Sequence, residues 1–158
     1  MMLPSPCSIG STHNSELYKH ARLYTFSSET KEKLRKFRLG TSRAKDPQAV
    51  IYQIDKSNLE IAQADDTVYT NMQELAEELP PHSPRYVLLS YPLTLASGRQ
   101  SVPYVLLYYL PVTCNAELRM LYAGAKELMR NTAEVGRVIE LADTEDLETI
   151  EEKLGGEQ

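Results

Sequence analysis

The stretch NAELRMLYAGAKELMRNT, residues 115–132, decides the fold, because its apolar residues recur at the spacing of about 3.6 residues that is typical of an α-helix. Asn115 is a favourable helix N-cap, and Glu117 in the first turn interacts favourably with the helix dipole. One broad face of the helical wheel carries an apolar stripe that can pack on a core, formed by Leu118, Leu121, Tyr122, Ala125, Leu128, Met129 and Thr132. We therefore predict one long amphipathic helix.

The opposite face of this helix lacks the long charged side chains that a solvated face ordinarily carries. It consists of Met120, Ala123, Gly124 and Glu127, and it is bordered by Arg119, Lys126 and Arg130. Gly124 costs about 1 kcal/mol relative to alanine inside a helix, so we expect another group to approach it closely. The pattern predicts a docking helix with one flexible apolar side chain, Met120. A surface helix with apolar residues scattered by chance is the alternative, since single exposed apolar residues are common.

The rest of the chain alternates between strand and helix patterns. Runs rich in β-branched and aromatic residues predict strands over residues 22–26, 49–54, 59–62, 86–95, 102–110 and 138–141. Capping residues and helical spacing predict three further helices, from Ser27–Ser28 to about Gly40, over residues 71–79 and over residues 144–154. This order predicts an α/β (α+β) domain in which a sheet lies between two layers of helices.

Two of the predicted strands, residues 86–95 and 102–110, are almost continuously apolar. Strands of this kind are covered on both faces of their sheet, which agrees with the three-layer prediction. Pro103 removes one donor from the sheet ladder, so we expect it at a bulge, at a strand start or at a free edge.

The composition is that of an ordinary soluble protein, with 158 residues, 42% of them hydrophobic and 25% charged. We expect residues 1–20, rich in Ser, Pro, Thr, Asn and His, to form a disordered extension, and residues 21–156 to form one domain. A net charge of −5 argues against a general nucleic-acid binder. Two cysteines fit a reducing cytosol. The chain has no apolar run of about 18 residues and no secretory signal, so we expect a cytoplasmic protein that does not span a membrane.

Motifs for catalysis, cofactors and metals are missing from the sequence. His13 and His20 lie in the N-terminal extension and His82 lies in a Pro-rich loop, so we expect no metal site, no cofactor and no catalytic residue. Cys114 precedes a helix N-terminus, where a thiolate is stabilised, and a thiol enzyme is therefore an open alternative that needs a base within reach. By elimination the chain is predicted to be an interaction module.

The helix predicted to end near Gly40 carries five basic residues, Lys31, Lys33, Arg35, Lys36 and Arg38. Such a run is usually a solvated face, and a surface that binds a partner is the alternative.

Eight short motifs occur together in one order: KLRKFR (33–38), PRY (84–86), SY (90–91), GR (98–99), MLYAGAK (120–126), TAE (132–134), TEDL (144–147) and EKLG (152–155). In this order they resemble the glia maturation factor branch of the ADF/cofilin-homology family, over residues 21–155. The resemblance implies a central mixed sheet of five to six strands between helices. It also implies a non-enzymatic regulator of the actin cytoskeleton, located in the cytoplasm at cortical actin, including actin patches.

The resemblance further implies how the long helix is used. In the family this helix inserts into a cleft of actin or of an actin-related protein, and the exposed methionine corresponds to Met120. Cofilin has two basic residues just before that methionine, whereas this chain has Glu117 and Arg119. The acidic residue favours the branch that binds the actin-related-protein (Arp) branching complex, inhibits nucleation and promotes debranching. A cofilin-like protein that binds and severs actin filaments is the alternative.

The residues that the resemblance assigns form two surfaces. The first surface, on the long helix and the N-terminal strand, is Arg22, Arg119, Met120, Ala123, Gly124, Lys126 and Glu127. The second surface, assigned by position, is Arg99, Glu148, Glu151 and Glu152. We expect a monomer that binds the Arp complex, and actin weakly or at the branch junction, without nucleic acid, membrane or cofactor. Met120→Asp combined with Gly124→Lys is expected to abolish docking and leave the domain folded.

Overall fold

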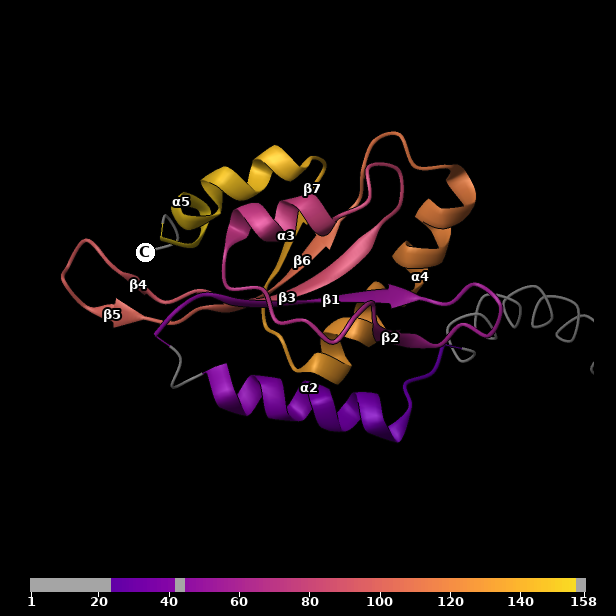
Figure 1. The fold of residues 1–158 in the computed structure, drawn as a ribbon, viewed down its shortest axis with the longest axis horizontal. Helices are drawn as coiled ribbons and strands as arrows, with labels where there is room; N and C mark the ends of the chain where they lie inside the picture. Colours follow the sequence, from indigo (N-terminus) through magenta and orange to yellow (C-terminus); the bar gives the residue numbers. More distant parts are fainter. Residues whose placement is uncertain (1–23, 42–44, 156–158) are drawn as a thin grey trace, which may run out of the picture.

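The computed structural model describes residues 24–41 and 45–155, and its central sheet lies between layers of helices (Figure 1). The helices are α2 (Ser28–Thr41), α3 (Met72–Glu78), α4 (Ala116–Ala133) and α5 (Ile150–Gly155), and the 3₁₀ helix η1 (Thr144–Thr149) leads into α5. The strands of the main sheet are β1 (Gln48–Ile54), β2 (Ile61–Gln63), β3 (Arg85–Ser90), β6 (Tyr104–Tyr109) and β7 (Val138–Leu141). A separate hairpin consists of β4 (Leu93–Thr94) and β5 (Gln100–Ser101).

The main sheet is mixed, with the strand order β2-β1-β3-β6-β7. Three neighbouring pairs are antiparallel, and β6 pairs with β7 in parallel. A parallel pair needs a long crossover connection, and the 18 residues of α4 form it between β6 and β7. The predicted α+β fold with a mixed sheet of five to six strands is therefore confirmed.

Each central strand contributes to two cores, one on each face of the sheet. On β3, Tyr86 and Leu88 face the cluster formed with α2 and α4, whereas Val87 and Leu89 face the cluster formed with α3, η1 and α5. Figure 1 shows α2 on one side of the sheet and α3 and α5 on the other. Because side chains alternate between the faces, a strand covered on both faces must be apolar at every position, which explains the continuous runs in the sequence.

Four predicted elements differ from the structure. The two long strands are interrupted, because β3 ends at Ser90 and β6 begins only after Pro103, although the Tyr91 amide still donates to the Pro103 carbonyl at 3.1 Å. The last helix begins as a 3₁₀ turn, where the Asp143 side chain accepts from its first amides. Of the predicted strand 22–26, the described part pairs only as a bridge between Thr25 and Glu60. Residues 1–20, expected to be an extension, lie outside the described residues.

Tyrosine hydroxyls hold α4 against the sheet. Three of them donate to α4 carbonyls, Tyr24 to Leu121 at 2.8 Å, Tyr86 to Tyr122, and Tyr104 to Ala133 at 3.1 Å. The hydroxyl of Tyr122 in turn accepts from the Ile54 amide of β1 at 3.0 Å. These hydrogen bonds are directional, so they fix both the position of α4 and its rotation about its axis.

The Tyr24 hydroxyl also explains Gly124. A Cβ atom placed on Gly124 would lie 2.8 Å from that oxygen, closer than side chains pack. The close approach expected from the sequence is therefore confirmed, and its cause is the segment that precedes α2.

We expect Gly124→Ala to lower the free energy of unfolding by about 1 kcal/mol, because the overpacking against Tyr24 exceeds the gain in helix propensity. In a Tyr24→Phe background the obstructing oxygen is gone, so the same substitution should be neutral or stabilising. Urea denaturation of the four proteins of this cycle measures the coupling.

Gly40→Ala is a matched control, since a Cβ atom at Gly40 in α2 has no atom within 4 Å. We expect it to be neutral or slightly stabilising. Additive effects of Gly124→Ala and Tyr24→Phe would show that the contact does not explain the glycine.

Candidate docking surface

The helix α4 begins and ends close to the predicted residues. The Asn115 side chain accepts a hydrogen bond from the Leu118 amide at 2.8 Å, as an N-cap does, and Glu134 ends the helix in a left-handed conformation with φ of 57°. Its buried side carries Tyr122, Ala125, Met129 and Ala133, in agreement with the apolar stripe. The remaining face is therefore directed away from the core.

The outward face of α4 contains the predicted strip, and Met120 is its most prominent side chain, with 74% of its surface exposed. Ala123, Gly124 and Glu127 are exposed beside it. A large apolar side chain left this open on a helix has no role in the core of this fold. These residues are exposed, while Arg22 lies outside the described residues.

Val112 extends this strip, and sequence reasoning did not identify it. Its side chain is 74% exposed, in the loop just before α4. The Arg119 guanidinium donates to the carbonyls of Pro111 and Val112 at 3.5 and 3.4 Å, so it ties this loop to the first turns of α4. A valine in a loop has no periodicity that indicates its direction, which is why the sequence alone gave no signal.

The basic residues around the strip are held in different ways. Lys126 is half-buried, and its ammonium lies 5.7 Å from the centre of the Tyr108 ring, a cation–π contact. Burial raises the pKa of Tyr108 to about 12. Arg130 donates to the carbonyls of Val135 and Gly136 and thus closes the end of α4. Arg119 and Lys126 are the cations that border the exposed methionine.

The acidic residues near the strip each have a basic partner. Glu117 pairs with Lys56 of the β1–β2 turn at 3.0 Å, and Glu127 pairs with Arg130 at 3.5 Å. These pairs are exposed, so each contributes at most about 1 kcal/mol to stability. The pair at Glu117 brings the β1–β2 turn next to the first turn of α4, a proximity that the sequence did not predict.

Gly124 has a structural role that makes the combined substitution with Gly124→Lys unsuitable as a test. Any side chain at this position meets the Tyr24 hydroxyl, which is bonded to the Leu121 carbonyl. The expectation that Gly124→Lys leaves the domain undisturbed is therefore not supported. Met120 is free of this conflict, since its side chain is exposed.

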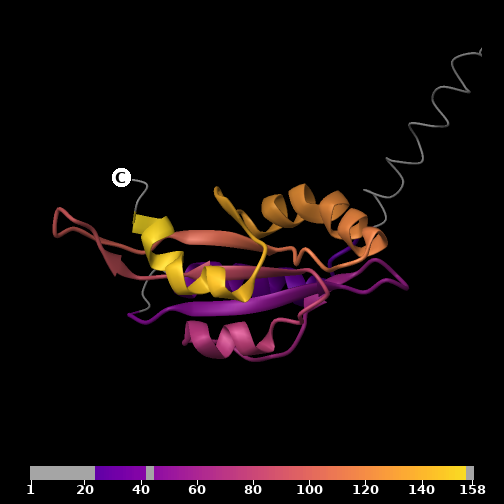
Figure 2. The ribbon, with the colours of Figure 1, turned by 90° about the horizontal axis from the view of Figure 1, so that it is seen from above.

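The residues of the predicted second surface lie on three elements. Glu148 belongs to η1, and Glu151 and Glu152 belong to α5, all three exposed. Arg99 lies in the turn of the β4–β5 hairpin, which projects from one end of the molecule in Figures 1 and 2. The hairpin and α5 meet through Tyr91, whose hydroxyl donates to Glu151 Oε2 at 3.4 Å. Within the described residues Arg99 forms no ion pair with the three glutamates.

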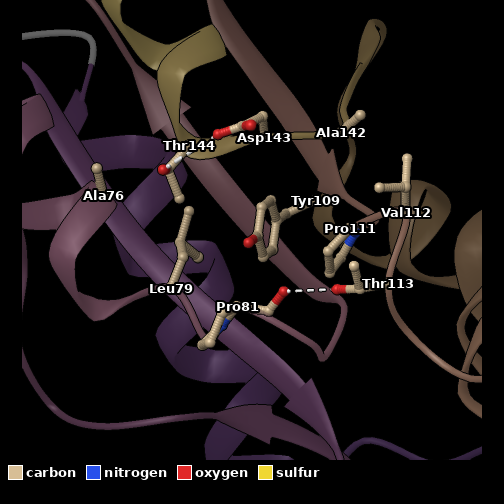
Figure 3. A pocket seen from close by; sticks show the side chains of 10 residues that line it. All are labelled: Ala76, Leu79, Pro81, Tyr109, Pro111, Val112, Thr113, Ala142, Asp143 and Thr144. Atoms are coloured by element: carbon tan, nitrogen blue, oxygen red, sulfur yellow. Dashed lines mark hydrogen bonds between the residues drawn. The ribbon is translucent and has the colours of Figure 1, made fainter.

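A cavity of about 300 Å³ lies beside Val112, between the end of α3 and the loops before α4 and η1 (Figure 3). Its polar groups are used by the fold. Thr113 Oγ1 donates to the Pro81 carbonyl at 3.1 Å and lies 2.7 Å from His82 Nδ1. The Asp143 side chain accepts from the Glu145 amide at the start of η1. The contacts of Thr113 join the loop before α4 to the loop after α3, and the lining has no reactive pair.

The described residues give no support to a thiol enzyme or a metal centre. Cys114 is 8% exposed, and the nearby His82 ring is bonded to Thr113. In residues 24–41 and 45–155 no group of three or more His, Cys, Asp and Glu side chains is arranged to hold a metal ion. No helix in this part of the chain is long and apolar enough to cross a bilayer.

The comparisons with known proteins agree with this architecture. Residues 23–155 match the family described as cofilin/tropomyosin-type actin-binding protein. Glia maturation factor beta of Homo sapiens is 38% identical over 126 residues, which cover 78% of this chain and 87% of the relative. Protein AIM7 of Saccharomyces cerevisiae is 37% identical over 149 residues, which cover 85% of this chain and 97% of the relative.

A solved structure leads to the same group. The solution structure of glia maturation factor from Caenorhabditis elegans superimposes with a TM-score of 0.68 at 32% sequence identity, covering 83% of this chain and 95% of the other. The chain therefore belongs to the cofilin/tropomyosin-type family of actin-binding proteins and, within that family, to the glia maturation factor group.

Proposed function

We propose that this protein is a non-enzymatic regulator that binds the Arp branching complex through the outward face of α4, inhibits its nucleation of actin and promotes debranching. The observation that carries the proposal is Met120, 74% exposed on a helix that the fold holds rigidly. Membership of the glia maturation factor group supports the choice of partner. The protein would act as a monomer at cortical actin in the cytoplasm, without a cofactor, nucleic acid or membrane.

The strip has the features of an interaction hot spot. Met120 and Val112 are exposed apolar side chains. Arg119 is bonded to the Val112 carbonyl, and the ammonium of Lys126 lies against the Tyr108 ring. Burying an apolar side chain of this size in a cleft contributes about 1.5–3 kcal/mol, while the charges at its rim choose between similar partners. An actin-related subunit has the same kind of cleft as actin, so the rim must provide the selectivity.

The proposed inhibition of nucleation follows from the occupation of a cleft by α4. A helix seated in the cleft of an actin-related subunit excludes the actin contact that nucleation needs at the same cleft. For debranching, the second surface around Arg99, Glu148, Glu151 and Glu152 would contact the filament beside the complex. A bound protein shifts the equilibrium between a joined and a separated branch only by the difference between its binding free energies for the two states.

A cofilin-like actin-binding and filament-severing protein is the second candidate. The exposed Arg119 favours it, because cofilin has basic residues at this end of the helix. Glu117 argues against it, since a carboxylate there reduces the positive charge offered to actin. Pull-down of the purified protein with the Arp complex and, in parallel, with actin separates the two candidates.

We expect Met120→Asp to weaken binding to the Arp complex by about 100-fold, because the substitution removes the apolar anchor and brings an unpaired carboxylate into the cleft. Pull-down or co-sedimentation measures the loss. Leu39→Asp is the matched control, an exposed apolar residue of α2 that is 54% exposed. Full binding by a folded Met120→Asp protein would contradict the proposal.

We expect Val112→Asp to weaken the same binding by about tenfold, because this valine continues the strip beyond α4. Thermal unfolding monitored by circular dichroism checks that the loop substitution leaves the fold intact. Unchanged affinity would limit the docking surface to α4 itself.

We expect Glu117→Lys to raise the affinity for actin several-fold, as this position then matches the basic pair of cofilin. Glu117→Gln is the control, because it breaks the pair with Lys56 without adding a positive charge. Fluorescence titration of labelled monomeric actin measures both variants. If the two variants bind actin alike, residue 117 does not select the partner.

A further inference from the structure

A groove of about 530 Å³ runs between α2 and the β2 edge of the sheet. Lys36 and Phe37 of α2 form one wall, Tyr52 of β1 and Gln63 of β2 form the floor, and Val68 lies at the opening. None of the residues lining it belongs to α4, so it is a surface distinct from the docking strip. Its volume is within the range of pockets that bind small ligands or several side chains.

Apolar and aromatic side chains line the groove. Val68 is 45% exposed although it is apolar. Tyr52 lines the groove with a side chain that is only 1% exposed. Burial raises the pKa of Tyr52 above its ordinary value.

The α2 side of the groove is positively charged. Lys33 is neutralised by Glu29 at 3.4 Å and by Asp66 at 3.3 Å. Lys36, by contrast, forms no ion pair among the described residues, and the same holds for Lys31 and Arg35 on the same helix. An acidic ligand therefore has free cations to bind on this side.

The outer edge of β2 is paired with Thr25 at Ile61 and leaves the backbone of Gln63 for an extended ligand. The Ile61 amide donates to the Thr25 carbonyl at 2.8 Å, so it points away from β1. Amides of alternate residues in a strand point the same way, and the Gln63 amide therefore also points outwards. The order of the sheet gives β2 no second strand neighbour within the described residues.

From these contacts we propose that the groove binds an extended acidic segment of a partner protein, with an apolar anchor residue over Phe37 and Val68 and a carboxylate on Lys36. This surface goes beyond the proposed binding of the Arp complex and does not depend on it. It would give the basic run of α2 a function as a partner-binding surface. A membrane fits the groove less well, because a lipid surface cannot enter a concave site and Asp66 lies on its rim.

The test uses a fluorescein-labelled peptide of sequence Asp-Asp-Leu-Leu-Asp-Asp with the full chain. Fluorescence anisotropy should show saturable binding. The peptide Asp-Asp-Ser-Ser-Asp-Asp should bind about tenfold more weakly, and Lys-Lys-Leu-Leu-Lys-Lys should not bind. In ¹⁵N-labelled protein, the amides that shift should be those of α2, β2 and the segment up to Val68.

Two substitutions at the groove provide the decisive comparison. Lys36→Glu and Val68→Asp should each weaken the peptide by about tenfold. Lys153→Glu, the same charge change on α5, should have no effect. Met120→Asp should bind the peptide normally, and Lys36→Glu should still bind the Arp complex, so failure of either proposal can be recognised separately.

Three results would overturn the groove proposal. The first is absence of binding to the wild-type chain, and the second is equal binding by Lys36→Glu, Val68→Asp and Lys153→Glu. The third is sedimentation of the wild-type chain with phosphatidylserine vesicles, lost in Lys36→Glu, without binding of the acidic peptide, which would assign the cations to a lipid surface.

Discussion

The hydrogen bonds from tyrosine hydroxyls to the backbone of α4 are the constraint on which the rest of the structure depends. Tyr24 and Tyr104 reach carbonyls at residues 121 and 133, and these two bonds approach α4 from different segments of the chain. A helix held at several points cannot rotate about its axis without breaking buried bonds, each of which costs about 1–3 kcal/mol when a partner is left unsatisfied. Met120 is thereby kept on the outside, where it is 74% exposed.

The sheet also separates charge. The helices on one face, α2 and α4, carry eight basic and four acidic residues, whereas α3, η1 and α5 on the other face carry one basic and eight acidic residues. A net charge of −5 conceals this asymmetry. A charge distribution of this kind orients a protein as it approaches a charged partner, and it presents the α2 and α4 side to acidic surfaces. The docking strip and the α2 groove both lie on that side.

The sequence predictions were correct where residues close together in the chain determine the structure, and they were incomplete where distant residues determine it. Periodicity and capping found α4 with its Asn115 cap, and continuous apolar runs predicted a sheet covered on both faces, because these signals come from residues close together in the chain. The long strands were predicted too long, since the break between β3 and β4 depends on how the chain turns into a separate hairpin. Val112 was missed because its exposure depends on the position of a loop that Arg119 holds.

By itself the sequence determined the helices, most of the strands, the mixed sheet expected from the family motifs and the outward direction of Met120. These features follow from local spacing or from the ordered motifs, which are visible along one dimension. Only the tertiary structure decided why residue 124 is glycine, where Lys56 lies relative to Glu117, and that α2 and the β2 edge form a groove. Each of these depends on residues far apart in the chain, and their distances are fixed only when the whole core packs.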